Sequence, residues 1–379
     1  MRILLLGEYS CLHNSLKEGL INLAHEVTIV GNGDGFKKYP IDFNIDAKWS
    51  KSKLINIPRQ IIYRLFKYDF AQLEYGIRFY FLLSKLKNFD VVQLISETPI
   101  QTNIKLEYYL LRRIKEQNNK MFLLSSGADV IFTQALIDNK FRYSLLDPYF
   151  KNPLLIEEYR HVLKYLDCDH KEHHRKIYSL IQGVIATDID YVIPLKENPK
   201  YLGLIPNPIN LEKLSYFENK VIDKIVIFHG INRWNYHKKG NDIFEEALSI
   251  IKNKFGSKVI ITIVENIPYQ NYIKLYDDAH ILLDQVYAYD QGYNALEAMA
   301  KGKVVFTGAE SEFMAHYQLI EIVAINALPE VNEIVKALSF LIENPKEITT
   351  IGKRARTFVE KEHDYIKIAD HYLRVWNEN

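Results

Sequence analysis

Residues 280–306, HILLDQVYAYDQGYNALEAMAKGKVVF, combine residue types that could bind a phosphate and a hydroxyl group together. The apolar run 280–283 predicts a buried strand, and the segment after Gly292 predicts a helix that ends at Gly302. The first turn of a helix offers free backbone N–H groups and the positive end of the helix dipole, which favour a phosphate. Glu297 lies one turn into this helix, where its carboxylate could accept hydrogen bonds from ribose or sugar hydroxyls.

Basic and polar residues that could bind a diphosphate follow other predicted strands of the second half. Arg233 comes after the strand predicted at 224–229, and Lys239 stands just before a predicted helix. Because Arg presents a planar fork of donors and Lys a point charge, this pair suits a diphosphate. The candidate residues for the nucleotide side of a site are Arg233, Lys239, Glu297, Gly292, Tyr293, Asn294, Gln285 and Asn207.

Two residues of the first half are candidates for contact with a second substrate. Asp129 follows the strand predicted at 121–125, and His13 lies in the loop after the strand predicted at 2–6. A loop-capping aspartate and a surface histidine are the structural alternatives. The residues alone leave both interpretations open.

Two further polar patterns are interpreted as structural. Asp188-Ile189-Asp190 has the Asp-x-Asp form that many metal-dependent sugar transferases use, but such short acidic patterns are common by chance. The histidines at 170, 173 and 174 have no spaced carboxylate or cysteine to complete a metal-ligand set. We therefore predict a solvated helical face around these histidines and no metal site.

Alternating strand and helix patterns must position these residues. Strands are predicted at 2–6, 26–30, 90–95, 121–125, 183–187 and 201–205, and then at 224–229, 258–264, 280–283, 304–306 and 321–325. Between the two series, Pro206-Asn207-Pro208-Ile209-Asn210 predicts a rigid, non-helical joint. This pattern predicts an α/β protein with two Rossmann-like domains, 1–205 and 206–360, and a ligand in the cleft at their strand ends.

Length and composition agree with that organisation. A chain of 379 residues exceeds what one hydrophobic core usually supports. The net charge of +1 gives no sign of a nucleic-acid partner. Two cysteines, Cys11 and Cys168, fit a reducing cytoplasm, and no apolar run approaches the roughly 20 residues that span a bilayer.

Residues 54–89 interleave aromatic and aliphatic side chains with basic ones. Between Lys48 and Lys87 there are nine Lys or Arg residues against Asp69 and Glu74 only. One interpretation is an amphipathic surface that meets anionic lipid or a lipid-linked substrate, at the inner face of a membrane. The alternative is one or two core-packed helices with a solvated basic face.

The order of these motifs resembles the retaining glycosyltransferases of the GT-B class, most closely the family-4 type, also called glycosyl transferases group 1. Pro206-Asn207-Pro208 occupies the place of the family's interdomain turn, and Arg233 with Lys239-Gly240 resembles its pyrophosphate-binding pair. Residues 297–305, EAMAKGKVV, resemble the second half of its acidic motif. The resemblance also implies a C-terminal helix, 361–379, that packs back on the first domain.

The chain departs from the family pattern at three points. The position of the first motif glutamate is Tyr289, with Asp290 adjacent, and Gly292 is retained. In addition, Arg233 comes three residues after Gly230 instead of directly after it. Since the family's first glutamate lies near the transferred sugar, the sugar contacts are the part of the resemblance that Tyr289 weakens, whereas Glu297 keeps the place of the ribose ligand.

The resemblance implies transfer of a sugar from a nucleotide-sugar to an acceptor hydroxyl by a hexosyltransferase-like enzyme. It also implies that the anomeric configuration is retained. It implies further that the enzyme uses no metal and no cofactor besides the nucleotide-sugar. The acceptor is expected to be a saccharide or a lipid-linked molecule of surface polysaccharide or glycolipid synthesis. The alternatives are a nucleotide-sugar epimerase of similar fold and a non-catalytic nucleotide-sugar-binding protein, which Tyr289 would favour.

Overall fold

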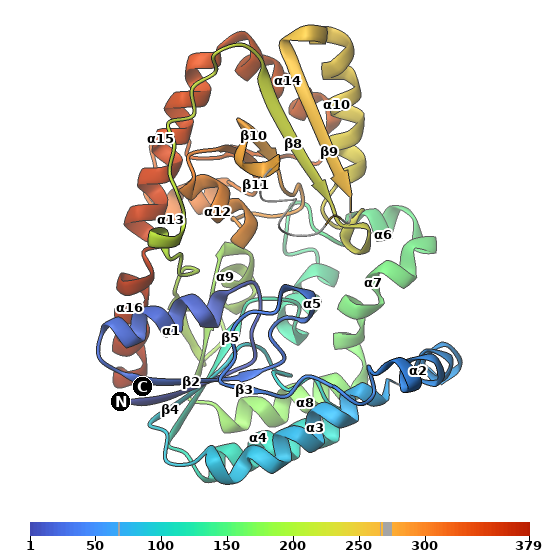
Figure 1. Cartoon of the computed structure of the whole chain (residues 1–379), viewed down its shortest axis with the longest axis vertical. Helices are drawn as coiled ribbons and strands as arrows, with labels where there is room; N and C mark the ends of the chain where they lie inside the picture. Colours follow the sequence, from blue (N-terminus) through green and yellow to red (C-terminus); the bar gives the residue numbers. More distant parts are fainter. Residues whose placement is uncertain (67–68, 266, 268–274) are drawn as a thin grey trace.

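Two parallel β-sheets, each flanked by helices, organise the chain (Figure 1). The computed structural model describes residues 1–66, 69–265, 267 and 275–379. The first sheet has the order β3-β2-β1-β4-β5-β6-β7 and the second the order β12-β11-β10-β8-β9. Every described pair of neighbouring strands is parallel, so helices or loops must connect them and cover both sheet faces.

The strands are short apolar runs, and those in the middle of each sheet are buried on both faces. The first sheet contains β1 (Arg2–Leu6), β2 (Glu26–Gly31), β3 (Phe43–Asn44), β4 (Val91–Leu94), β5 (Lys120–Ser125), β6 (Gly183–Ala186) and β7 (Tyr201–Leu204). The second contains β8 (Ile225–Ile231), β9 (Val259–Glu265), β10 (Ile281–Leu283), β11 (Val304–Thr307) and β12 (Ile325–Asn326). The predicted fold of two Rossmann-like α/β units is confirmed.

Helices cover both sheets in the described part of the chain. The first series is α1 (Leu12–Asn22), α2 (Lys53–Phe66), α3 (Phe70–Leu82), α4 (Ile104–Glu116), α5 (Val130–Ile137), α6 (Asp147–Lys151), α7 (Ile156–Leu163), α8 (Cys168–Leu180) and α9 (Ile189–Leu195). The second is α10 (Asn241–Phe255), α12 (Tyr293–Ala300), α13 (Ser311–His316), α14 (Val331–Glu343), α15 (Pro345–Glu362) and α16 (Tyr365–Glu378).

Two predicted elements differ from the structure, and a third cannot be compared with it. The first helix begins at Leu12, because the left-handed backbone of Cys11 (φ 73°) turns the chain into it, so His13 is helical and not in a loop. The strand predicted at 321–325 is reduced to β12, since only Ile325 and Asn326 pair with β11. Most of the helix predicted at 269–276 lies outside the described residues.

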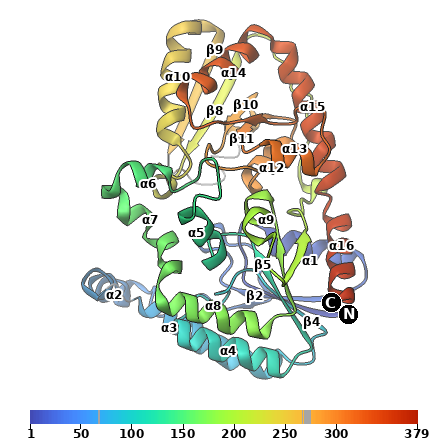
Figure 2. The same ribbon diagram turned by 180° about the vertical axis from the view of Figure 1, so that it is seen from behind.

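Helix α2 contradicts the core-packed interpretation for its part of residues 54–89, whereas α3 packs one face on the core. Figures 1 and 2 show α2 extending away from the two sheets. Its Leu54, Ile57, Ile61 and Leu65 recur at helical spacing and are all exposed, Leu54 to 90%. On α3 only one face is buried, and residues 73, 77 and 81 of the same helix are exposed apolar side chains. No helix among the described residues is both long and apolar enough to cross a bilayer.

The C-terminal helix returns to the first sheet, as predicted. Asp364 caps α16 by accepting hydrogen bonds from the N–H groups of Ile366 and Lys367. The helix lies against α1 (Figure 2) and buries Tyr372 and Trp376 in the core of the first sheet. There the Trp376 indole N–H donates to Gln93 Oε1 at 3.0 Å. The end of the chain therefore fastens the second α/β unit to the first.

We predict that Trp376→Ala lowers the free energy of unfolding by about 3–5 kcal/mol, the usual effect of truncating a buried tryptophan. Trp376 is fully buried, and its loss also leaves Gln93 Oε1 without its donor. Urea denaturation of the purified variant measures the change. Trp234→Ala is the matched control, because Trp234 is 81% exposed and its truncation should change stability by less than about 0.5 kcal/mol. Equal stabilities of the two variants would contradict this account of α16.

Candidate active site

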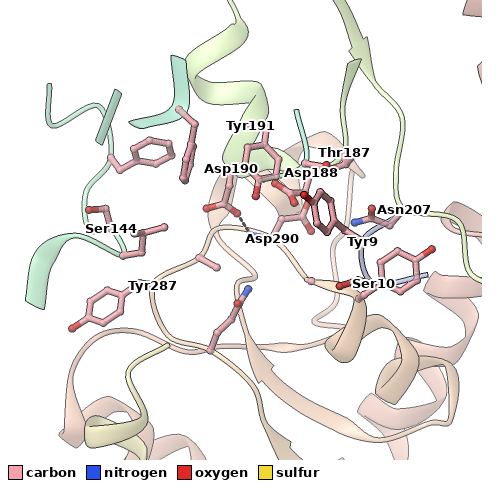
Figure 3. A pocket seen from close by; sticks show the side chains of 18 of the residues that line it. Tyr9, Ser10, Ser144, Thr187, Asp188, Asp190, Tyr191, Asn207, Tyr287 and Asp290 are labelled. Atoms are coloured by element: carbon pink, nitrogen blue, oxygen red, sulfur yellow. Dashed lines mark hydrogen bonds between the residues drawn. The ribbon is translucent and has the colours of Figure 1, made fainter. Parts of the chain in front are cut away.

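A pocket of about 240 Å³ lies where the carboxyl ends of the two sheets meet (Figure 3). Its wall from the first sheet comes from the loops after β1, β5 and β6, and its wall from the second comes from the loop between β10 and α12. The polar lining residues include Tyr9, Ser10, Ser126, Ser144, Thr187, Asp188, Asp190, Asn207, Gln285, Tyr287 and Asp290. A ligand here would contact both α/β units, as expected for the carboxyl edge of parallel sheets.

Three carboxylates cluster at this pocket and connect its two walls. Asp190 accepts hydrogen bonds from Tyr289 N at 3.0 Å and from Asp290 N at 3.1 Å. Asp290 in turn accepts from Ile189 N at 3.1 Å, and from Gln291 N at 2.7 Å. The third, Asp188, has a buried Oδ1 without a hydrogen-bond partner among the described residues. The segments 188–190 and 289–291 are thus held together by hydrogen bonds in which a carboxylate of each accepts from backbone N–H groups of the other.

Burial sets the protonation of these acids. It raises the pKa of Asp190 to about 7 and that of Asp290 to about 6. It also raises the pKa of Asp188 well above its usual value, and the charges of Asp190 and Asp290 add to this rise. Near neutral pH the cluster therefore keeps protons that exposed carboxyl groups would have lost.

Four predicted residues line the pocket: Asn207, Gln285, Gly292 and Tyr293. Gly292 precedes the first residue of α12, and no side chain caps that helix. The Tyr293 hydroxyl donates to the carbonyl oxygen of Pro208, so its ring packs between the two units. The backbone of Asn207 is fixed by His363, whose Nδ1 lies 2.9 Å from the Asn207 carbonyl oxygen.

Lys239 and Asn294 meet at one buried carboxylate beside the pocket. Asp284 Oδ1 accepts from Lys239 Nζ at 2.9 Å and from Asn294 Nδ2 at 3.0 Å. Its Oδ2 lies 3.3 Å from Thr307 Oγ1. Asp284 therefore ties the segment before α10, the end of β10 and the first turn of α12 into one unit. The Lys239 side chain remains about one third exposed.

Arg233 lies apart from this unit. Its guanidinium forms a two-bonded ion pair with Glu265, with both N–O distances at 2.7 Å, at the ends of β8 and β9. The residue does not line the pocket. A role for Arg233 in binding a diphosphate stays a prediction.

Glu297 occupies a different environment. No hydrogen bond or ion pair to its carboxylate is present among the described residues, although burial is sufficient to raise its pKa. The charges of Lys37 and Lys301 oppose this rise, so the carboxylate faces the first unit as well as its own helix. An unpartnered, partly exposed carboxylate has unused capacity to accept hydrogen bonds from hydroxyl groups.

Asp129 and His13 are both integrated in the scaffold. Asp129 caps α5, with Oδ1 2.7 Å from Phe132 N and Oδ2 2.8 Å from Ser125 Oγ, and burial raises its pKa to about 6. The His13 ring is fully buried, not at the surface, and its Nδ1–H donates to the Gly7 carbonyl oxygen at 2.7 Å. Burial lowers the His13 pKa to about 4, so the ring is neutral at pH 7. Their contact with an acceptor stays a prediction.

Tyr289 does not line the pocket that Asp290 lines, although its ring packs against two residues that do. Its hydroxyl accepts from Arg142 N at 2.6 Å, and its ring lies 5.4 Å from Phe141 and 5.2 Å from Tyr143. The Arg142 guanidinium then bonds to the Glu310 and Glu312 carboxylates of the second unit. The tyrosine at the motif position is therefore an interface residue, and Asp290 is the side chain that the loop presents to the pocket.

Sequence reasoning underrated the Asp-x-Asp segment and the histidines. Asp188 and Asp190 follow β6, and their place at a strand end was the available signal. The solvated face predicted for the histidines is wrong for two of them, because His173 Nε2 contacts the Glu97 carbonyl oxygen at 2.8 Å and His174 Nδ1 contacts its carboxylate at 2.6 Å. No group of three His, Cys, Asp or Glu side chains in the described ranges is arranged to hold a metal ion.

We predict that Asp190→Asn changes the pH dependence of stability. A carboxyl group with a raised pKa stabilises the folded protein below its unfolded pKa, and this contribution is lost as pH rises through the folded pKa of about 7. Between pH 5 and pH 8 the Tm of the unmodified protein should therefore fall relative to that of Asp190→Asn, by about 2 °C or more. Thermal unfolding across this range measures the difference, in which the titration of groups outside the Asp188–Asp190–Asp290 cluster cancels. Parallel curves for the two proteins would contradict a raised pKa at Asp190.

Comparisons with known proteins agree with this geometry. Residues 226–374 match the family described as glycosyl transferase-like. Sucrose-phosphate synthase from Thermosynechococcus elongatus is similar over 100% of this chain and 99% of its own, with 15% identity and a TM-score of 0.62. Anabaena HepE, in complex with UDP and glucose, is similar over 100% of both chains, with 11% identity and a TM-score of 0.60.

A UDP-GlcNAc 2-epimerase from Neisseria meningitidis, bound to UDP-GlcNAc, is also similar, over 100% of both chains, with 14% identity and a TM-score of 0.54. A comparison with the sequences of curated proteins finds no match. The structural similarities extend over both α/β units, whereas the family match falls in the second unit and the C-terminal helices. The chain therefore has the GT-B fold of two facing Rossmann-like units, and its residues 226–374 are similar to the glycosyl transferase-like family.

Proposed function

We propose that the protein transfers a sugar from a nucleotide-sugar to an acceptor hydroxyl, with the pocket between the two units as the reaction site. The observation that carries this proposal is the pairing of an uncapped helix start with an unpartnered carboxylate. The N-terminus of α12 opens at the pocket, and Glu297 follows four residues after Tyr293. A diphosphate at the N–H groups of α12 and a ribose at Glu297 would use both features.

Lys239 supports the same placement of the donor. Its ammonium already bonds to Asp284, and its partial exposure leaves donor capacity for a phosphate oxygen. As the glycosidic bond breaks, negative charge grows on the leaving diphosphate, and this ammonium with the α12 N–H groups would stabilise it. HepE was solved with UDP, which makes uridine the first nucleotide to test. Transfer with retention, in surface polysaccharide or glycolipid synthesis, completes the proposal.

We expect Glu297→Ala to weaken UDP binding by roughly tenfold, the loss of hydrogen bonds between a charged group and ribose hydroxyls. Lys239→Ala should reduce sugar transfer more strongly than binding, because its charge is needed as the diphosphate leaves. Calorimetry measures the first effect and initial rates with a labelled UDP-sugar measure the second. Lys254→Ala is the control, since Lys254 bonds to Ser339 on the remote face of the second unit. Unchanged binding and transfer in both site variants would remove the assignment of the donor site.

The same labelled donor separates the alternatives. Turnover of the UDP-sugar without any acceptor, to an isomeric sugar, would identify an epimerase instead. Binding of UDP with no turnover on any acceptor would identify a non-catalytic nucleotide-sugar-binding protein. An acceptor-dependent product supports transfer, and the anomeric configuration of that product, read by NMR, tests retention.

The exposed apolar faces of α2 and α3 support a peripheral membrane contact as part of this proposal. Apolar residues of the two helices are exposed beside the basic Arg64, Lys48 and Lys85. Such a surface combines insertion into the lipid interface with attraction to anionic headgroups. The acceptor would then be a saccharide or lipid-linked molecule presented at that surface.

We predict salt-sensitive binding to vesicles of phosphatidylglycerol and phosphatidylcholine in equal amounts, and weaker binding to phosphatidylcholine alone. The double variant Ile57→Ser and Ile61→Ser should weaken binding by roughly tenfold or more. The reason is that burying each isoleucine side chain in the lipid stabilises binding by about 1.5 kcal/mol. Co-sedimentation measures it. The control is Ile222→Ser with Ile320→Ser, two exposed isoleucines away from α2 and α3. Absence of co-sedimentation at low salt would exclude the membrane contact.

A further inference from the structure

A second cavity, of about 700 Å³, lies within the first α/β unit and adjoins the pocket between the units. Its walls come from α3, α4, the turn 164–166 and the start of α8. Tyr9 lines both cavities, and its hydroxyl is held by Gln101 Nε2 at 2.9 Å. The Tyr9 side chain therefore separates a site for the donor from a larger space on the side of the first sheet.

On the wall of this second cavity, one lysine forms an ion pair with a carboxylate and two do not. Lys176 forms an ion pair with Glu172 at 2.5 Å. Lys164 and Lys105 also line the cavity, and within the described ranges no carboxylate lies within 4.0 Å of either ammonium. Asp169 is the remaining acid on the wall. Burial lowers the pKa of Lys164, whose ammonium lies 5.0 Å from the centroid of the Tyr165 ring. Its charge is therefore held in a partly desolvated place, with no carboxylate partner among the described residues.

Polar groups near Lys164 are also unsatisfied. His170, in the first turn of α8, has a buried Nδ1 without a hydrogen-bond partner in the described part of the chain. His173, also on the wall, is almost fully buried, and its Nδ1 likewise lacks a partner there. No side chain caps α8, so its first N–H groups remain available. Buried polar groups without partners are uncommon in folded proteins, and several at one cavity indicate a polar ligand.

We infer that the second cavity binds an anionic group of the acceptor, with the Lys164 ammonium as its main charge partner and Lys105 at the rim. The inference rests on the proposed transfer reaction and assigns its acceptor a phosphate ester or a sugar carboxylate. An anion at Lys164 would gain a charge-assisted hydrogen bond and neutralise a partly buried cation. The acceptor could then extend past Tyr9 and bring a hydroxyl group to the donor pocket.

The neighbourhood of the cavity favours an acceptor with an apolar part. Gln72 of α3 lines the cavity, and the next residue, Leu73, begins the exposed apolar face of that helix. A phosphate in the cavity and an apolar chain along α3 would use both surfaces. A carboxylate sugar would use the cavity alone, so the two sources of the anion differ in what else they contact.

Calorimetry with the donor site filled by saturating UDP tests the inference. The probes are farnesyl phosphate and glucuronate, with farnesol and glucose as their neutral counterparts. At least one anionic probe should bind, with its neutral counterpart roughly tenfold weaker or more. Lys164→Met, which keeps the apolar stem, should reduce the affinity for that anion to a similar extent. Lys171→Met should leave it unchanged, because Lys171 is on α8 but does not line the cavity.

The outcomes distinguish the two proposals. Binding of farnesyl phosphate assigns a phosphate to the acceptor, and binding of glucuronate assigns a carboxylate. Failure of both anions to bind, or equal binding by Lys164→Met, would overturn the inference while UDP binding left the proposed transferase intact. Loss of UDP binding with Lys164-dependent anion binding would instead remove the donor site and leave the anion cavity.

Discussion

The contact of Asp190 and Asp290 with each other's loops is the constraint on which the arrangement of the two units depends. Each carboxylate accepts backbone N–H groups from the opposite side of the pocket. A buried carboxylate that is ionised needs several donors, and two of them close together repel one another. The raised pKa values of both acids show how the structure meets this cost, because one or both carry a proton near neutral pH. The contact between these two loops is thus coupled to proton binding by Asp190 and Asp290.

This contact also explains why the loop at 287–292 has its shape. Tyr289 N and Asp290 N bond to Asp190, while the Tyr289 side chain packs among Arg142, Phe141 and Tyr143. The Asp290 carboxylate is then the group that faces the pocket. A family-type glutamate at 289 would have to give up this packing to reach a sugar. At this position the tyrosine ring therefore contributes to the contact between the two units, and the adjacent Asp290 lines the pocket.

Local patterns predicted most of the fold, because buried parallel strands are continuous apolar runs and helices have a clear period. They also located Gly292, Asn207 and Gln285 at the pocket, since residues after parallel strands share one edge. They missed what depends on contacts distant in sequence. The Asp190–Asp290 contact joins residues a hundred positions apart, and the burial of His13 results from the start of α1, which a left-handed Cys11 fixes. The exposure of α2 was left open, because an apolar stripe at helical spacing fits both a core-packed helix and an amphipathic surface.

The two cavities differ in whether their basic side chains are paired with carboxylates. The basic residues predicted for the diphosphate are both paired, Arg233 with Glu265 and Lys239 with Asp284. An arriving diphosphate would compete with carboxylates there, so its binding depends on the start of α12 more than on net positive charge. In the second cavity Lys164 is partly buried and has no carboxylate partner among the described residues, so an anion would bind there without displacing one. Binding of an anionic acceptor would then gain from charge neutralisation, whereas binding of the donor would gain from hydrogen-bond geometry. Two anionic substrates can therefore occupy neighbouring sites of one cleft without competing for the same cations.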